Sequence, residues 1–421
     1  MLDIKFIREN KDIVKAGAQK KQMDADIDKL LALDDERLKQ LKEVEDLRSE
    51  INRVSNDIAV SKDPALRNQL IEEMRAVKEE IKEKEGRLKK TMEEWQKFML
   101  LVPNVPDVTV PEGKSDEENA EIRTWGEKPN FNFTPKDHVA ILESLDLADF
   151  ERGAKVSGFR GYFMKRDGTR LFFALWQYFL DYFISKGYIP MIVPSLVRKE
   201  SLLGTGYLPA GEEDLYKTQD GEYLAGTAEV AMMSYYSGEI LDKQSLPYKF
   251  IAFSPCFRRE AGAHGKDIKG IIRVHEFFKL EQVILCEANH EESVKLHEEI
   301  TAHVEHLMQE LKLPYRVVAN CGGDLGLGQV KKYDIEAWMP SQGKYRETHS
   351  SSYFHDFQTR RLNIKYRDDD GKSRYAHSLN NTACATSRLP AAILENYQQA
   401  DGSVKIPEVL RKYMGGKEFI K

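Results

Sequence analysis

The sequence lacks any apolar run long enough to cross a membrane or to form the core of a signal peptide. No stretch of about 18 apolar residues occurs, and charged residues interrupt the first segment, MLDIKFIRENKDIVKAG. We therefore predict a cytoplasmic protein with no membrane partner.

Cysteine is scarce as well. The four cysteines, Cys256, Cys286, Cys321 and Cys384, lie far apart and form neither a CxxC pair nor a metal-ligand spacing. We expect no disulfide framework and no structural zinc, and we interpret all four side chains as reduced thiols. A free cysteine is more often a small buried hydrophobic residue than a redox switch.

The chain also has no excess of positive charge. Its formal net charge is −6, which argues against a protein that coats itself with nucleic acid by bulk electrostatics. Any RNA contact must therefore be local. Charged residues are nevertheless abundant, at 31% of the chain, and this composition is typical of a protein with a long exposed helical segment.

Apolar residues recur at helical spacing in two segments between about residues 27 and 99. Steps of three and four residues give each segment the heptad pattern of a coiled-coil strand. The first stripe consists of Leu41, Val44, Leu47, Ile51, Val54 and Ile58. The second consists of Leu70, Met74, Val77, Ile81, Leu88, Met92, Trp95 and Met99.

Pro64 lies between the two stripes, where it can open the second helix after a polar turn. We therefore expect an antiparallel helical hairpin. A helix of about thirty residues is about 45 Å long, so the hairpin is expected to form a projecting arm. On periodicity alone, an oligomerisation coiled coil is the favoured interpretation.

The segment after the second helix, LLVPNVPDVTVPEGKSDEEN, contains three prolines and then charge without periodicity, which predicts a linker. Beyond the linker, short strands and helices follow one another without regular alternation. We predict an α+β fold with a mainly antiparallel sheet flanked by helices for residues 111–421. Residues 1–110 are predicted to form a separate N-terminal domain.

The most informative segment runs from Phe253 to Leu285, where two apolar strands flank a long loop with three glycines. Alternation with a period of two predicts that Arg258 and Glu260 share one face of the first strand. It predicts the same of Arg273, Phe277 and Glu281 on the second strand. Arginines match phosphate or carboxylate oxygens, a ring can stack on a base, and a carboxylate can accept from an amine. The segment therefore indicates a nucleotide site, although a solvated hairpin face with ion pairs is an alternative that the residues leave open.

These residues carry a resemblance to a known family. FRRE followed by RVHEF, within residues 253–285, resembles motif 2 of the class II aminoacyl-tRNA synthetases. GYIPMIVPSLV, at 187–197, resembles motif 1, and residues 379–397 resemble motif 3. GTAEVA at 226–231, YRETHSSS at 345–352 and LNNTACATSR at 379–388 are similar to the seryl family of bacterial type. The resemblance covers nearly the whole chain.

The resemblance implies an ATP site and assigns roles within it. Arg258 would contact the α-phosphate and the serine carboxylate, and Glu260 would accept from the adenine amino group. Phe277 and Arg388 would sandwich the adenine ring, and Arg273 would hold the terminal phosphates. The four charged residues of this set are the expected catalytic residues.

The resemblance also implies a magnesium site and a serine site. Glu347 and Ser350 would ligate Mg²⁺ beside ATP, with the oxygen donors that a hard cation requires. The residues expected around serine are Thr227, Glu229, Arg258, Glu281, Asn380 and Thr382. A pocket built to hydrogen-bond the serine hydroxyl rejects alanine, which would leave its buried polar groups unpaired. Thr382 and Glu281 are our candidates for the contact to this hydroxyl.

The implied function is serine activation with ATP, followed by transfer of serine to the 3′ end of serine tRNA; charging of selenocysteine tRNA is left open. The resemblance further implies a homodimer in which the helical hairpin grips the long variable arm of the tRNA. Residues 26–60 contain six basic and ten acidic side chains and show no basic stripe. Phosphate contacts would have to come from selected positions such as Arg48, Arg53, Lys62, Arg67, Arg75 or Lys78.

Several alternatives stay open at this point. His264, Lys266 and Lys269 in the motif 2 loop could touch the acceptor end of tRNA or merely solubilise the loop. A related ligase could load a carrier protein, and a catalytically dead relative could act as an RNA-binding scaffold. The full-length helical hairpin argues against the former, and the retained charged residues argue against the latter.

Overall fold

The structure is a computed structural model that describes residues 1–262, 267 and 269–421. The chain forms two compact units, one of residues 2–19 and 23–103, and one of residues 1, 20–22 and 104–421. Along the described part of the chain, no helix is both long and apolar enough to cross a membrane.

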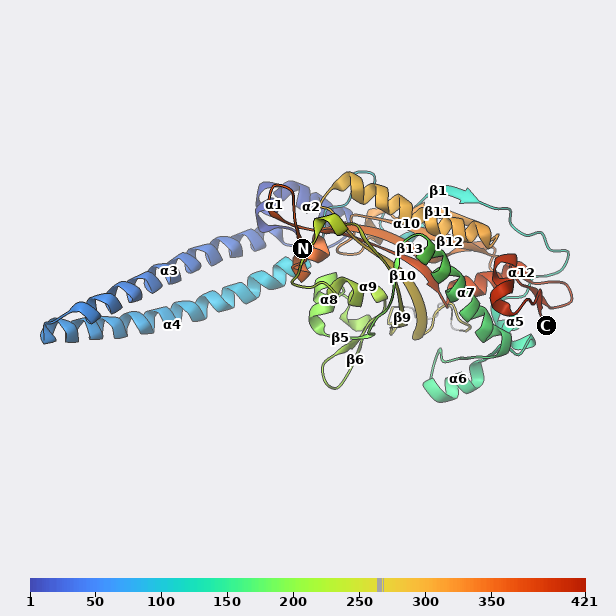
Figure 1. The fold of residues 1–421 in the computed structure, drawn as a ribbon, viewed down its shortest axis with the longest axis horizontal. Coiled ribbons are helices and arrows are strands. Elements are labelled where there is room, and N and C mark those ends of the chain that lie inside the picture. Colours follow the sequence, from blue (N-terminus) through green and yellow to red (C-terminus); the bar gives the residue numbers. More distant parts are fainter. Residues whose placement is uncertain (263–266, 268) are drawn as a thin grey trace. The chain divides into compact units, whose positions relative to one another are not determined.

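The first unit is helical. Its elements are α1 (Ile4–Glu9), α2 (Lys11–Lys20), α3 (Ile27–Val60) and α4 (Pro64–Leu101). The long helices α3 and α4 pack side by side as an antiparallel hairpin (Figure 1). The Asp63 side chain caps α4 by accepting from the backbone N–H of Ala65, and Pro64 occupies the first turn. The predicted helical hairpin is confirmed.

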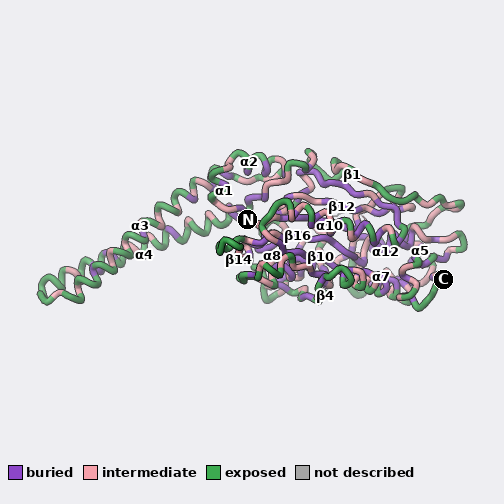
Figure 2. The backbone as a smooth tube through the Cα atoms, turned by 45° about the horizontal axis from the view of Figure 1, so that its top comes forward, coloured by how far each residue is buried: buried purple, intermediate pink, exposed green. Residues whose placement is uncertain are grey.

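Most of the two apolar stripes form the seam between α3 and α4, with Val54 and Leu88 among the buried members. Buried positions form only a narrow stripe along these helices (Figure 2). Met92 departs from the prediction, because its side chain is 47% exposed. Seam positions of a heptad are alternately three and four residues apart, and the three-residue step from Leu88 leads to Thr91. Thr91 is half-buried and occupies the seam position that we expected Met92 to fill.

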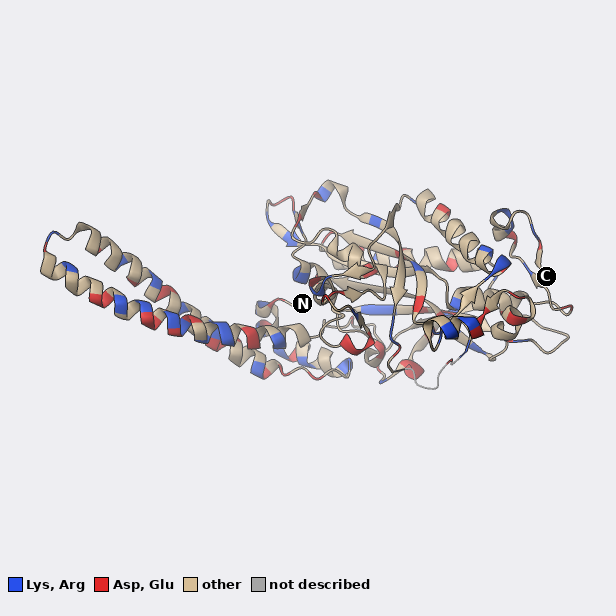
Figure 3. Ribbon diagram, turned by 90° about the horizontal axis from the view of Figure 1, so that it is seen from below, with Lys and Arg blue, Asp and Glu red and all other residues tan. Residues whose placement is uncertain are grey.

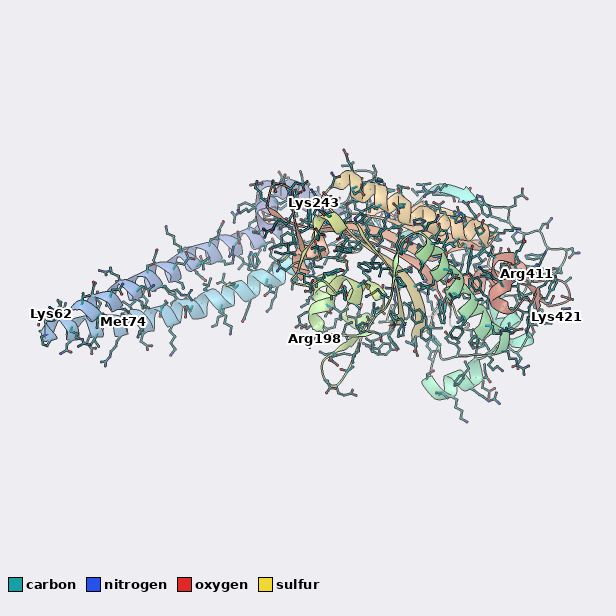
Figure 4. All side chains as sticks on the ribbon, in the orientation of Figure 1. Lys62, Met74, Arg198, Lys243, Arg411 and Lys421 are labelled. Atoms are coloured by element: carbon teal, nitrogen blue, oxygen red, sulfur yellow. The ribbon has the colours of Figure 1, made fainter. Side chains whose placement is uncertain are left out.

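Charged side chains of both signs alternate along α3 and α4 (Figure 3). Some of them join the helices: Lys84 Nζ lies 2.9 Å from Glu43 Oε2, and Arg48 donates to Glu85 over 2.7 Å. Lys62 stands at the turn that connects the two helices (Figure 4). These pairs reinforce the seam, and each contributes little because it is exposed.

The second unit is built on an eight-stranded sheet. In spatial order its strands are β1 (Ala120–Trp125), β11 (Tyr315–Ala319), β12 (Lys331–Met339), β13 (Lys344–His355), β16 (His377–Ala385), β10 (Glu276–Cys286), β9 (Tyr248–Phe257) and β4 (Ile189–Ile192). Every neighbouring pair is antiparallel except β4 and β9. The predicted α+β fold with a mainly antiparallel sheet is confirmed.

Eight α-helices, from α5 to α12, and several small sheets complete this unit in the described part of the chain. The helices are α5 (His138–Ser144), α6 (Phe150–Ser157), α7 (Arg166–Ser185), α8 (Lys199–Thr205), α9 (Ala228–Ser234), α10 (His290–Glu310), α11 (Phe357–Leu362) and α12 (Arg388–Tyr397). The small sheets comprise β2 (Ala148–Asp149) with β3 (Phe163–Met164), β5 (Leu196–Val197), β7 (Tyr223–Leu224) and β6 (Tyr216–Lys217), β15 (Ser373–Tyr375), β14 (Lys365–Arg367) and β8 (Ile240–Leu241), and β17 (Val404–Lys405) with β18 (Phe419–Ile420).

The two faces of the β9–β10 hairpin serve different purposes. On one face, Ile251 and Ile284 join the main core with residues of α7, α10 and α12. On the other face, Phe250 and Val283 join a smaller apolar cluster with residues of α9 and α11. Because α9 has only seven residues, it covers only part of that second face. The remainder of the face is free to carry polar side chains.

Truncating a core residue of α10 should destabilise the unit. Leu307 is fully buried, so we expect Leu307→Ala to lower the free energy of unfolding by about 2–5 kcal/mol through lost burial and an unfilled cavity. Denaturant unfolding of the full chain measures the change. Lys295→Ala, on the exposed side of the same helix, should change it by less than about 0.5 kcal/mol; equal effects of the two variants would contradict the assigned core.

Candidate active site

Strand β10 carries a row of functional side chains on the face that α9 leaves uncovered. Phe277, Lys279 and Glu281 alternate with core residues, and they pair with Cys256, Ser254 and Ala252 of β9 in unbroken register. The regular pairing explains why a period of two correctly grouped Phe277 with Glu281.

Arg258 and Glu260 were expected within the first strand, and Arg273 within the second. This expectation was wrong. Strand β9 ends at Phe257 and β10 begins at Glu276. Arg258 still donates its backbone N–H to His275 O over 3.0 Å, but Glu260 has a left-handed backbone with φ of 54°. The chain therefore leaves the strand geometry at the positions where the alternation was meant to continue.

The nucleotide end of the site is held together by ion pairs. Arg273 donates to Glu260 over 2.8 Å, and Arg388 donates to Glu347 over 2.8 Å. The Arg258 guanidinium lies 5.5 Å from the ring centroid of Phe277. These residues, except Arg273, line a small cavity of about 90 Å³ together with Lys279 and Thr382. Arginines, carboxylates and an aromatic ring in one cavity can bind the phosphates, the base and the amino group of a nucleotide.

Two further residues extend this network beyond what the sequence predicted. Asp267 forms ion pairs with both Arg273 and Arg346. Arg346 belongs to the segment YRETHSSS, in which we predicted a role only for Glu347 and Ser350. Of the three loop residues considered for tRNA, His264 and Lys266 lie outside the described residues. Lys269 lines a separate cavity together with Asp267.

A bulge in β13 brings the two expected magnesium ligands to one face. Strict alternation would put Glu347 and Ser350 on opposite faces, because three positions separate them. The register against β12 shifts at Thr348, so that Glu347 pairs with Glu336 and Ser350 with Asp334. Since residues 334 and 336 share a face, their partners do too.

The donor set fits a magnesium ion held jointly with a nucleotide. Burial alone would raise the pKa of Glu347. The nearby charges of Arg388 and Lys332 outweigh this effect and lower the pKa to about 2. The carboxylate is therefore anionic at neutral pH, and Ser350 adds a neutral oxygen. Among the residues described here, no group of three or more His, Cys, Asp and Glu side chains could hold a metal. Magnesium commonly takes its remaining ligands from phosphates and water.

The serine end of the site is deeply buried. Lys279 donates to Thr227 Oγ1 over 2.8 Å and forms an ion pair with Glu281. Thr382 lies directly across the strands from Glu281, so both side chains reach the same small volume. Asn380 pairs with Val283 in the same ladder, two positions further from the cavity. Glu281, Thr382, Asn380 and the unpredicted Lys279 therefore share one face of the sheet, and Thr227, the N-cap residue of α9, contacts that face through Lys279.

Glu229 lies in this region as well, at the start of α9. Its carboxylate accepts from Tyr207 OH over 2.9 Å and from Gln358 Nε2 over 2.6 Å. Burial, reinforced by the nearby Glu281, raises the pKa of Glu229 to about 7. Burial likewise raises the pKa of Glu281, against the opposing effect of Lys279. Two buried carboxylates can together hold a small cation such as an ammonium group.

Cys256 and Cys384 are both buried beside the site, and burial raises the pKa of each thiol. A raised pKa disfavours the reactive thiolate. The interpretation of these residues as small buried hydrophobic groups is therefore supported.

The fold and the site together define a class II aminoacyl-tRNA synthetase. Residues 216–397 match the model of the tRNA synthetase class II core domain (G, H, P, S and T), and residues 1–106 match that of the seryl-tRNA synthetase N-terminal domain. The chain is 46% identical to a serine–tRNA ligase of Deinococcus radiodurans, over 100% of this chain and 99% of that protein. The chain belongs to the seryl-tRNA synthetase family, which confirms the resemblance found in the sequence.

Solved structures agree with this family membership. A seryl-tRNA synthetase from Pyrococcus horikoshii complexed with ATP matches with a TM-score of 0.90 and 41% identity, over 100% of this chain and 99% of that one. A cytoplasmic serine–tRNA ligase from Naegleria fowleri in complex with AMP matches with a TM-score of 0.87 and 32% identity, over 100% and 99% of the two chains.

We expect Glu229→Gln to stabilise the protein above neutral pH. The pKa of Glu229 is raised from 4.5 to about 7, so its favourable contribution is present below pH 4.5 and is lost as the pH rises through 7. The shift corresponds to about 3 kcal/mol. Denaturant unfolding at several pH values should therefore show a gain for the variant that grows from acidic to alkaline pH.

Glu213→Gln provides the control, because Glu213 is an exposed residue. Its unfolding free energy should follow that of the unsubstituted protein at every pH. A stability difference for Glu229→Gln that does not change with pH would contradict the assigned protonation.

Proposed function

We propose that this chain acts as a serine–tRNA ligase, which converts serine and ATP to seryl-adenylate and pyrophosphate and then transfers serine to the 3′-terminal adenosine of serine tRNA. One observation carries the proposal. A ring for a base and a carboxylate for an ammonium lie on one face of β10, with Lys279 between them and Arg258 at the same cavity. The relatives from Pyrococcus horikoshii and Naegleria fowleri, solved with ATP and AMP, support a nucleotide at the corresponding place.

ATP is bound by charge and stacking. Phe277 and Arg388 sandwich the adenine ring, and Glu260 accepts from its amino group. Arg258 contacts the α-phosphate, while Arg273 exchanges its present partner for the terminal phosphates. Guanidinium groups suit this task because they stay charged and offer several donors to phosphate oxygens.

Serine is bound by its three polar groups. Its ammonium lies against Glu281 and Glu229, its carboxylate against Arg258, and its hydroxyl against Thr382 and Glu281. Thr227 and Asn380 complete the wall of the pocket. Alanine is rejected because it would leave buried polar groups unpaired, and threonine because the buried walls leave no room for its methyl group.

In the first step, a serine carboxylate oxygen attacks the α-phosphorus while the bond to the bridging oxygen of pyrophosphate breaks. Arg258 stabilises the negative charge that develops on the α-phosphate. Glu347 and Ser350 would hold Mg²⁺ with ATP, and this ion would supply further charge neutralisation. In the second step, the terminal ribose hydroxyl of the tRNA attacks the activated carbonyl and AMP leaves.

The remaining parts of the proposal concern partners. Residues 1–110 form the tRNA-binding domain and residues 111–421 the catalytic domain of a cytoplasmic homodimer. The α3–α4 hairpin contacts the variable arm of serine tRNA. Lys62, Arg67 and Lys78 suit phosphates best, because no ion pair engages them within the described residues, whereas Arg48 and Arg75 already pair with Glu85 and Glu72.

Serine-dependent exchange between ATP and pyrophosphate tests the activity. Each of the twenty amino acids is assayed separately with Mg²⁺, and we expect exchange with serine alone. Arg258→Ala should lower the serine-dependent rate at least about 100-fold, because it removes a charged contact to the transition state.

Arg259→Ala is the matched control. The neighbouring arginine is exposed and donates to the backbone of Glu213, so its loss should leave exchange nearly unchanged. Exchange with a different amino acid would overturn the serine assignment, and a folded Arg258→Ala variant with full activity would overturn the role of Arg258.

Replacing residues 35–95 by a short flexible linker tests the helical hairpin. Serine activation should persist, because the catalytic residues all lie in the other unit, whereas charging of serine tRNA should be lost. Aminoacylation and exchange are measured on the same preparation. Unimpaired charging by the truncated protein would refute the role of the hairpin in tRNA binding.

A further inference from the structure

Lys279 has no role in the function proposed above, yet it lies at the centre of the site. It stands between Phe277 and Glu281 on one face of β10, at about 7 Å along the strand from each. The proposed function puts adenine at Phe277 and the serine ammonium at Glu281. The atoms that react, the serine carboxylate and the α-phosphate, must therefore lie between these ends, above Lys279.

The side chain of Lys279 is bound to groups of the proposed serine pocket. Its side chain is only 7% exposed, forms an ion pair with Glu281 and donates to Thr227 Oγ1 over 2.8 Å. A buried ammonium is costly unless it is paired and hydrogen-bonded. Lys279 thus meets this requirement with two of the groups that the proposed function gives to serine.

Serine must compete with this internal partner. Its own ammonium needs Glu281, so binding of serine removes the ion pair that now holds Lys279. The lysine side chain is flexible and has three donors, and Arg258 lines the same cavity. Released from Glu281, the ammonium of Lys279 is drawn to the nearest new anions, which are the serine carboxylate and the α-phosphate.

We propose that Lys279 is a further catalytic residue of serine activation, which leaves its partner Glu281 and turns to the reacting anions when serine takes its place. This inference rests on the proposed function. The carboxylate oxygen forms the bond to the α-phosphorus, and the electron pair of the broken bond leaves with pyrophosphate. Lys279 keeps all its protons throughout and acts only by its charge, which lowers the repulsion between two anions that must meet.

Two substitutions separate charge from hydrogen bonding. Lys279→Gln can still donate to neighbouring oxygens but carries no charge, and Lys279→Arg keeps the charge. We expect the kcat of serine-dependent ATP–pyrophosphate exchange to fall about 100-fold in Lys279→Gln, with partial recovery in Lys279→Arg. Lys249→Gln is the control. Lys249 lies on β9 of the same hairpin, and its Nζ forms an ion pair with Glu299 Oε1 of α10 at 2.5 Å. Its loss should leave kcat nearly unchanged.

The KM for serine distinguishes catalysis from a structural role. Loss of the internal competitor should leave this KM unchanged or lower it in Lys279→Gln while kcat falls; a residue that merely supports the pocket would raise it. A normal kcat in Lys279→Gln, or a raised KM with normal kcat, would overturn the inference. If the unsubstituted protein shows no serine-dependent exchange, the proposed function itself fails, so the two failures are distinguishable.

Discussion

Buried charge on one face of the central sheet is the constraint on which the site depends. Lys279, Glu281 and Glu229 are nearly inaccessible to water, and each therefore needs a partner inside the protein. Lys279 and Glu281 provide partners for one another, while Tyr207 and Gln358 bond to Glu229. The site is consequently a network of mutual ion pairs and hydrogen bonds around a small cavity.

The sheet delivers this network through a regular part and an irregular part. The unbroken register of β9 and β10 separates core residues from functional residues by simple alternation. Elsewhere the alternation is interrupted. The bulge at Thr348 turns Glu347 and Ser350 to one face. A second register shift, between Leu280 and Glu281 on the β16 side, sets Thr382 opposite Glu281. Both bulges lie at the site, where re-aiming a side chain matters most.

These two parts explain how much could be predicted from the sequence. The helical hairpin and the placement of Phe277 and Glu281 on one face of a strand followed from periodicity, because regular helices and strands repeat side-chain directions. Bulges leave no such trace, so periodicity could not have brought Glu347 and Ser350 to one face; only the family resemblance paired them as magnesium ligands. The limits of the strands were also wrong near Glu260, where a left-handed residue ends the extended geometry.

Lys279 was overlooked for a related reason. It stands in the apolar run FFKLEQVIL, where a lone lysine reads as an edge or solvent-facing residue. The alternation that placed Phe277 and Glu281 already implied its direction, so the signal was available. Burial was the missing quantity, because it depends on Thr227, at the N-cap of α9, and on β16, which are distant in the sequence.

Mutual pairing of charges also bears on selectivity. Under the proposed assignments, a ligand that enters the serine pocket must compensate Glu281 when it displaces Lys279, which a neutral molecule cannot do. A molecule without an anionic group likewise leaves the displaced ammonium without a partner. Serine meets both demands, because it brings an ammonium for the carboxylate and a carboxylate for the ammonium. The same burial that makes unpaired charge costly therefore favours a zwitterionic substrate over ligands of similar size.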